Sequence, residues 1–347
     1  MDINRRFALG LGSAAAATAV LGTAGTASAQ AERTEADWDA LIPTTAELAR
    51  RKIAFKYGVA TLLAGGTWSS HIGVADPDCV VKPAVEDHAD RVVEAYSVNK
   101  IAVAVAVLDK VDRGLLRLDQ RVDVTADIVI HDTDGIFGLD GAYPSSVTLG
   151  HVLATLLTVS DNTCVRLCGL VVPALELNEI LRGKGFVHTQ VVPVANPNRF
   201  FLGTTTPRET STLLQKLVKG ELLSAASTAY LLNVLRSLTS FTDGVRLELS
   251  SQERLNVATK AGWFEDGRNE AGVVFDANGK AIVTYALFAS GAFRGNQAVN
   301  ADDYGATHPA LRARAALGRS MYDSVLRITT NATRAYRARP HHPWIGA

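Results

Sequence analysis

The sequence YSVNK at residues 96–100 opens a stretch rich in alanine and valine, which predicts a long helix over Val98–Val111. Residues three apart on a helix share a face, so Lys100 is expected to lie beneath the hydroxyl of Ser97. A lysine buried there would lose solvation of its charged form, which lowers its pKa and lets it act as a base for the serine. A surface serine and lysine on one helix is the alternative, because this spacing often arises by chance.

A second short motif, the tripeptide Ser160-Asp161-Asn162, follows about 60 residues later. The hydroxyl of Ser160 could carry a proton to a leaving nitrogen. The amide of Asn162 could hold a substrate carbonyl, because it has both a donor and an acceptor. Asp161 is expected to cap a helix rather than take part in chemistry, and a plain turn or cap between helices would also explain the whole tripeptide.

The third motif is Lys260-Ala261-Gly262, about 100 residues after the second. Lys260 is expected at the end of a strand facing a cleft, where its charge would serve the proton relay and a substrate carboxylate. Gly262 is expected to be a substrate contact beside it. The backbone N–H of Trp263 is expected to form an oxyanion hole with that of Ser97. The Trp263 side chain would either line the cleft or belong to the core, and Lys260 alone could be an exposed strand-end lysine.

The order and spacing of these motifs resemble the S-x-x-K, S-D-N and K-T-G signature of class A β-lactamases and penicillin-binding proteins. The resemblance extends over roughly residues 50–328. It implies Ser97 as the acylated nucleophile, with Lys100 as its base or the partner of its base. It also implies Ser160 as the relay, and Asn162 and Lys260 as substrate contacts. No metal or organic cofactor is expected, because the lysines would handle the protons.

The loop at residues 191–203 departs from that family pattern. Class A β-lactamases carry a glutamate there, which is the accepted base for hydrolysing the acyl-enzyme. Here the loop reads VVPVANPNRFFLG and has no Asp, Glu or His, so water attack on acyl-Ser97 is expected to be slow. Glu209 is better explained as the capping-box carboxylate of the next helix. Residues 130–134, with His131, are best explained as a solvated surface loop, but they are also the best place to look for a substitute base.

The third motif departs from the family as well, because Ala261 replaces a threonine. A hydroxyl that would bind the carboxylate of a substrate is therefore missing. Arg268 could supply a replacement contact, and the alternative for this residue is a solvated loop arginine.

The pattern of apolar and turn-forming residues predicts one antiparallel sheet, with terminal helices over one face and a helical lobe beside it, an α/β (α+β) arrangement. The family resemblance implies the β-lactamase/transpeptidase fold. The predicted elements are a helix at 36–51, strands at 53–63 and 68–74 around Gly65-Gly66, helices opening near Val98, Thr148 and Thr206, strands near 256–260, 272–275 and 281–289, and a helix at 307–327. The Asn278-Gly279 pair marks a hairpin between the last two strands. The site is expected in the cleft between the two lobes.

Length and composition are typical of a globular enzyme. The chain has 347 residues, 47% of them hydrophobic, and a net charge of zero. Balanced charge argues against a nucleic-acid partner, and no basic run suggests a membrane-binding patch. We expect a monomer acting on a small molecule or a cell-wall peptide. The catalytic domain is expected at residues 30–330, with an α/β lobe at about 30–100 and 226–330, a helical lobe at about 101–225, and a basic tail at 331–347.

Residues 1–29 resemble a targeting segment. Arg5 and Arg6 precede a weakly apolar stretch, and Ala27-Ser28-Ala29 is a small-residue cleavage site. Paired arginines favour the twin-arginine export route over an ordinary secretory signal. The mature protein is therefore expected to work outside the cytoplasm, without a stable membrane anchor.

Four functions remain open from the sequence. The first is a secreted serine hydrolase or acyltransferase that forms acyl-Ser97 from an amide, ester or β-lactam and turns β-lactams over poorly. The second is an effective class A-type β-lactamase with a different water base. The third is an esterase, D-amino-acid peptidase or biosynthetic acyltransferase. The fourth, a non-catalytic β-lactam-binding protein, is disfavoured because a binder need not keep Ser97, Lys100, Ser160 and Lys260 together.

Overall fold

The computed structural model describes residues 34–131 and 135–330. The expected signal peptide at 1–29, the basic tail at 331–347 and residues 132–134 lie outside the described residues. The chain forms two compact units, Met1–Ala40 and Leu41–Ala347. The short helix α2 (Glu35–Ala40) belongs to the first unit, and every element below belongs to the second.

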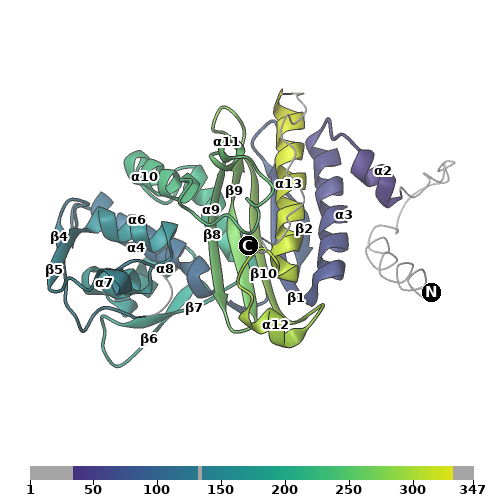
Figure 1. Cartoon of the computed structure of the whole chain (residues 1–347). Helices are drawn as coiled ribbons and strands as arrows, with labels where there is room; N and C mark the ends of the chain where they lie inside the picture. Colours follow the sequence, from purple (N-terminus) through teal and green to yellow (C-terminus); the bar gives the residue numbers. More distant parts are fainter. Residues whose placement is uncertain (1–33, 132–134, 331–347) are drawn as a thin grey trace. The chain divides into compact units, whose positions relative to one another are not determined.

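A five-stranded antiparallel sheet forms the centre of the second unit (Figure 1). Its order is β2-β1-β10-β9-β8. The strands are β1 (Gly65–Ala75), β2 (Val81–Asp87), β8 (Val257–Phe264), β9 (Gly267–Phe275) and β10 (Ala281–Phe293). Strands from both ends of the sequence pair directly where β1 meets β10. The prediction that the two strand sets join into one antiparallel sheet is therefore confirmed.

Two long helices, α3 (Ala46–Ala64) and α13 (Pro309–Thr330), lie side by side over one face of this sheet (Figure 1). The strand predicted at 53–63 is wrong, because this segment continues α3. Thr45 caps the helix through its side chain, and Gly65 ends it at a φ of 71°. Ile53 and Tyr57 are buried one helical turn apart against the sheet, which is the helical spacing that the strand prediction overlooked.

A second hydrophobic core surrounds helix α4 (Lys100–Asp112), whose residues Lys100–Leu108 are all buried. The elements in this part of the chain are η1 (Tyr96–Asn99), β4 (Arg121–Val124), α5 (Phe137–Asp140), β5 (Ser145–Thr148), α6 (Leu149–Thr158), α7 (Asn162–Val171) and α8 (Ala174–Gly183). Cys164 and Cys168 on α7 are buried free thiols. Burial raises the pKa of Cys168 to about 12.

Helices α9 (Pro207–Val218) and α10 (Ala225–Arg236) connect this core to the sheet. Helix α9 packs on β1, β9 and β10, and α10 packs on β8. The predicted cap of α9 is confirmed, because Thr206 accepts from the Glu209 N–H at 3.0 Å. The role expected for Glu209 is wrong: its carboxylate accepts from the backbone N–H groups of residues 187–189. It thereby anchors the chain before β6 (Gln190–Pro193), which forms a small sheet with β7 (Phe200–Thr205) and β3 (Val93–Glu94).

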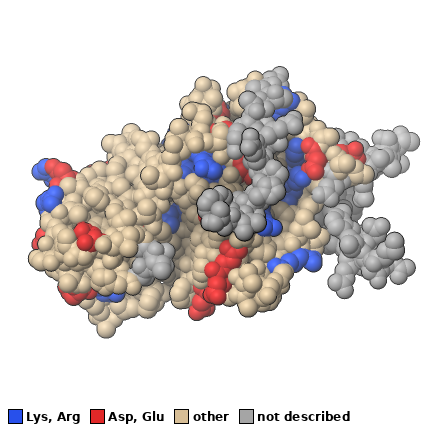
Figure 2. Space-filling model, in the orientation of Figure 1, with Lys and Arg blue, Asp and Glu red and all other residues tan. Residues whose placement is uncertain are grey.

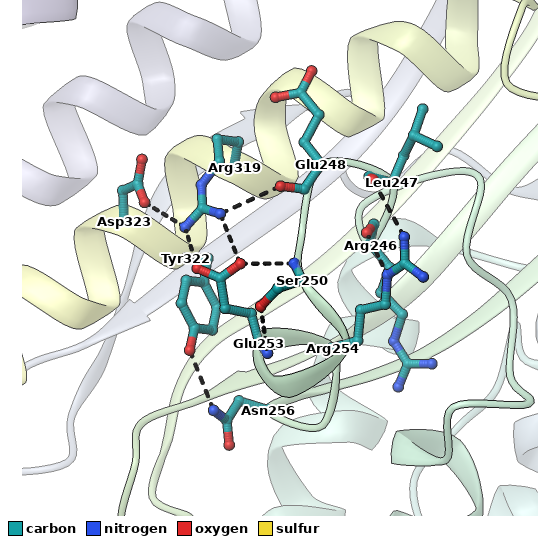
Figure 3. Close-up of polar contacts among 10 residues, drawn as sticks. All are labelled: Arg246, Leu247, Glu248, Ser250, Glu253, Arg254, Asn256, Arg319, Tyr322 and Asp323. Carbon is teal, nitrogen blue, oxygen red and sulfur yellow. Dashed lines mark hydrogen bonds and ion pairs between the residues drawn. The ribbon is translucent and has the colours of Figure 1, made fainter. Parts of the chain in front are cut away.

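A polar network fastens the approach to β8 onto α13 (Figure 3). Ser250 caps the short helix α11 (Ser251–Arg254) in a capping box with Glu253. The Glu253 carboxylate also accepts from both terminal nitrogens of Arg319 at 3.1 Å. Asn256 donates to the Tyr322 hydroxyl at 3.2 Å. These contacts hold the segment before β8, the strand that carries Lys260, in place against α13.

The surface carries both signs of charge. Figure 2 shows basic and acidic side chains in small groups among uncharged ones on the face in view, in keeping with the zero net charge. Among the described helices, none combines the length and apolar character that crossing a bilayer requires.

Candidate active site

The first motif sits on a strained turn. Residues Tyr96–Asn99 form the single 3₁₀ turn η1, which runs directly into α4. Tyr96 has a φ of 48°, an unfavourable conformation for a residue with a side chain. Its ring covers Gly267, where a Cβ would come within 2.2 Å of the ring. The turn is therefore fixed by packing on the β8–β9 hairpin, and Ser97 at its second position lines the main cleft.

Lys100 lies at the N-terminus of α4 and is fully buried. Its ammonium donates to Asn162 Oδ1 at 2.7 Å and to Ser160 Oγ at 3.0 Å. It also donates to the backbone carbonyl of Ser160. The first two motifs therefore meet in space, and the amine points into the protein rather than into bulk water.

Ser160 connects the second motif to the third. Its hydroxyl oxygen accepts from Lys100 and from Lys260, each at 3.0 Å. Its φ of 59° is again left-handed, and strained residues of this kind concentrate at functional sites. Two cationic side chains from distant parts of the chain thus share one serine hydroxyl at the edge of the cleft.

Asp161 holds the Ser160 turn in place. Its carboxylate accepts from the N–H groups of Thr163 at 2.8 Å and Cys164 at 3.3 Å, which caps α7. It also accepts from Ile136 at 2.7 Å and Phe137 at 2.9 Å. The capping role predicted for Asp161 is confirmed.

At the third motif, strand β8 packs closely against η1, the turn that carries Ser97. A Cβ on Gly262 would meet the backbone nitrogen of Val98 at 2.6 Å and that of Ser97 at 2.7 Å. Only glycine fits such an approach. Lys260 is buried and lies in the middle of β8, so the predicted strand-end position is wrong. Besides Ser160, its ammonium donates to the Ala261 carbonyl at 2.7 Å.

A cleft of about 700 Å³ brings the predicted residues together. Its lining includes six of them, with Lys100 buried behind: Ser97, Ser160, Asn162, Lys260, Gly262 and Trp263. The sequence analysis missed the segment 239–242 and Tyr304, which also line the cleft. These residues lie in connections after α10 and after α12 (Gln297–Asp302), and no motif marks them.

Arg268 is a predicted site residue that the structure places away from the cleft. Its side chain is fully buried. Its guanidinium donates to the backbone carbonyls of Glu265 at 2.6 Å, Asn300 at 3.0 Å and Asp303 at 3.1 Å. It also lies over the Tyr304 ring at 4.2 Å. Burial lowers its pKa, and its position indicates a structural role rather than contact with a substrate carboxylate.

No described residue that lines the cleft is an Asp, Glu or His. A second cavity of about 420 Å³ shares Asn162 with the cleft and extends towards Arg166, Arg199 and Phe200. Its described lining also lacks carboxylates and imidazoles. His131 is exposed and lines neither cavity. Within the described ranges, the site therefore contains lysines and hydroxyls as its proton-handling groups.

Comparison with known proteins agrees with this arrangement. The model of the β-lactamase enzyme family matches residues 73–325, more than half of the chain. The β-lactamase VEB-1 of Pseudomonas aeruginosa is 23% identical over 228 residues, which cover 62% of this chain and 76% of that protein.

Solved structures share the fold. A β-lactamase from Xanthomonas campestris superposes with a TM-score of 0.66 at 18% identity, covering 82% of this chain and all of that chain. The protein PBP-A gives a TM-score of 0.60 at 21% identity, covering 78% of this chain and 94% of that chain. With the motifs assembled in one cleft and the family model spanning most of the sequence, the chain belongs to the β-lactamase enzyme family and is a serine hydrolase of the β-lactamase-like superfamily.

Proposed function

We propose that this protein is a secreted acyl-transfer enzyme that forms an ester on Ser97 from an amide, ester or β-lactam and loses that ester to water slowly. One observation carries the proposal. The Lys100–Ser160–Lys260 hydrogen-bonded chain is complete, while the described lining of the cleft has no carboxylate or imidazole. The groups for acylation are present, and a base for hydrolysis is missing among them.

In the proposed acylation each of these groups has one role. Ser97 Oγ attacks the carbonyl carbon, and Lys100 in its neutral form receives the hydroxyl proton, a role that burial favours in an amine. Ser160 delivers a proton to the departing nitrogen or oxygen, so the leaving group departs neutral. The backbone N–H groups of Ser97 and Trp263 would stabilise the oxyanion, typically worth a few kcal/mol of barrier per donor. Asn162 and Lys260 would hold the substrate.

Deacylation requires an acceptor that loses a proton. Water is a weak nucleophile at neutral pH and needs a base beside the ester. An amine or alcohol seated where the leaving group was could instead give its proton back through Ser160 to Lys100. The site is therefore expected to transfer the acyl group to such acceptors, from small-molecule or cell-wall-peptide donors. The N-terminal Arg5-Arg6 pair and the 27–29 cleavage site support action outside the cytoplasm.

A second candidate is efficient β-lactam hydrolysis with another water base. The β-lactamase family match favours it. Ile130 lines the cavity beside Asn162, and His131 with two aspartates follows directly in the sequence. A base from residues 131–134 would then replace the missing glutamate.

Intact-mass spectrometry during incubation with benzylpenicillin and with a cephalosporin separates the candidates. A persistent adduct that is lost in Ser97→Ala, and kept in the exposed-serine control Ser251→Ala, supports the proposal. Fast product formation with no lasting adduct supports the β-lactamase. Turnover of simple esters without any β-lactam adduct indicates an esterase. Inertness toward all of these substrates contradicts an enzymatic role.

A further inference from the structure

Four aromatic side chains line one part of the catalytic cleft: Phe241, Trp263, Phe264 and Tyr304. The Trp263 ring stacks on Tyr304, with centroids 6.0 Å apart and planes 28° apart. Phe241 meets Trp263 edge to face at 4.8 Å. The Arg268 guanidinium supports Tyr304 at 4.2 Å. These contacts fix the rings before any substrate arrives, so they form a rigid aromatic wall.

This part of the cleft offers little to a carboxylate. Lys260 is the sole basic side chain in the described lining, and its ammonium already donates to Ser160 and to the Ala261 carbonyl. Ala261 has no hydroxyl to add. Arg268 donates to backbone carbonyls and stands outside the lining. A charged group placed here would lose water without gaining comparable partners.

We propose that the aromatic wall is the subsite for the leaving half of the acyl donor, and that it selects an uncharged aromatic alcohol or amine. The inference rests on the proposed acyl transfer at Ser97. The leaving atom must lie near Ser160, which would protonate it. Strand β8 leads from Lys260, beside Ser160, to Trp263 within three residues. Ser160, Trp263 and Tyr304 line the same cleft, so a ring attached to the leaving atom would lie on the side of Trp263 and Tyr304.

The covalent step balances without any co-reactant. With a benzyl ester, the bond from Ser97 Oγ to the acyl carbon forms and the bond from that carbon to the benzyl oxygen breaks. The electron pair of the broken bond stays on the benzyl oxygen. The proton of Ser97 passes to Lys100, Ser160 gives its own proton to the benzyl oxygen, and Lys100 then returns a proton to Ser160 across their hydrogen bond. Neutral benzyl alcohol is released, and Lys100 and Ser160 regain their starting protonation states.

The test compares three acetate esters: benzyl, cyclohexylmethyl and 4-carboxybenzyl acetate. The first two differ in aromaticity at similar size, and the third adds a carboxylate to the same ring. Released alcohol is quantified by chromatography to give kcat/KM. Ring stacking predicts a preference of about three- to tenfold for benzyl over cyclohexylmethyl, and a lower value for 4-carboxybenzyl than for benzyl.

Tyr304→Leu and Trp263→Leu are expected to bring the benzyl to cyclohexylmethyl ratio close to one. The control Leu63→Ala removes an exposed apolar side chain on α3 that lines neither cavity, and it should keep the wild-type ratio. A ratio taken within one variant cancels changes in folded fraction and in the catalytic groups. Equal rates for the two esters, a preference for the carboxylate, or an unchanged ratio in both leucine variants would overturn the inference. If no ester acylates Ser97 but a β-lactam adduct forms, the subsite inference alone fails; if neither forms, the proposed function fails as well.

Discussion

Gly262→Ala is expected to stop acylation while leaving the protein folded. The new Cβ would lie 2.6 Å from the Val98 nitrogen and 2.7 Å from the Ser97 nitrogen. It would also lie 2.9 Å from the Ala95 carbonyl oxygen. All three neighbours are backbone atoms, so no side chain can rotate away. Strand β8 and the nucleophile turn η1 would have to separate.

The size of this separation sets the expected loss. Ordinary contact begins at 3.4 Å, so the 2.6 Å approach requires the backbones to part by about 0.8 Å. The N–H groups proposed as the oxyanion hole lie on these two backbones, at Ser97 and Trp263. Misplacing one such donor typically costs about 10²- to 10³-fold in rate, or about 3 to 4 kcal/mol of barrier. We expect the acylation rate to fall by that factor.

The assay is the rate of Ser97 acylation, followed by intact mass with a single ester or β-lactam donor. The matched control is Gly58→Ala on α3, where an added Cβ meets no atom within 4 Å. That variant should acylate normally and gain up to about 1 kcal/mol of stability, because alanine favours a helix over glycine. An acylation rate for Gly262→Ala within threefold of the wild type would refute the proposed oxyanion hole. A circular dichroism spectrum matching the wild type excludes unfolding as the cause of a loss.

Three further predictions follow from the geometry. Ser160→Ala should lower kcat/KM about 10²- to 10³-fold for amide donors but much less for a p-nitrophenyl ester, whose leaving group needs no proton; equal losses would contradict the relay. Asp161→Ala leaves four backbone N–H groups without their acceptor. The free energy of unfolding, measured by urea denaturation, should fall by about 2 to 4 kcal/mol. A decrease under about 1 kcal/mol would argue against the capping role. Burial lowers the pKa of His308 to about 4 from 6.5. As the pH falls, the unfolded chain therefore takes up the proton before the folded chain does. The free energy of unfolding is expected to decrease by about 2 to 3 kcal/mol between pH 7 and pH 4. His308→Asn should flatten that dependence in denaturation curves at the two pH values, while its side chain can still accept the Ala310 N–H.

Elements with strong local signals were predicted correctly from the sequence. The hairpin between β9 and β10 is an example, because Asn278-Gly279 permits its turn. The α9 start is another, because Thr206 and Pro207 suit the first helical positions. The strand predicted at residues 53–63 was wrong because the apolar residues of helix α3 include β-branched and aromatic types that also suit a strand. Its packing against α13, 250 residues away in the sequence, decides the outcome, and local propensity cannot report such a contact.

The candidate site also combines residues that local motifs predict with residues that only the fold brings together. Local motifs predicted four residues of the site because their residue types indicate acyl-transfer chemistry: Ser97, Lys100, Ser160 and Lys260. Tyr304 comes from a connection without a motif, so only the fold brings it to the cleft. Arg268 was assigned wrongly because its direction depends on strand register rather than on neighbouring residues. It pairs with Trp263 across β8 and β9, and its guanidinium is held by carbonyls near α12.

The hydrogen bonds of Ser160 support the proposal that this site favours acylation over hydrolysis. Its oxygen accepts from the side-chain nitrogens of Lys100 and Lys260, each at 3.0 Å, which occupies both lone pairs. Its own proton is then left to point at a leaving atom in the cleft, as the first half of the reaction requires. Once the leaving group has gone, the same groups can take a proton only from a molecule seated in its place. An alcohol or amine with a ring would gain contacts with Trp263 and Tyr304 there, and water would not. We therefore propose that the aromatic wall, together with the lack of a carboxylate or imidazole in the described cleft lining, favours transfer of the acyl group to a bound acceptor.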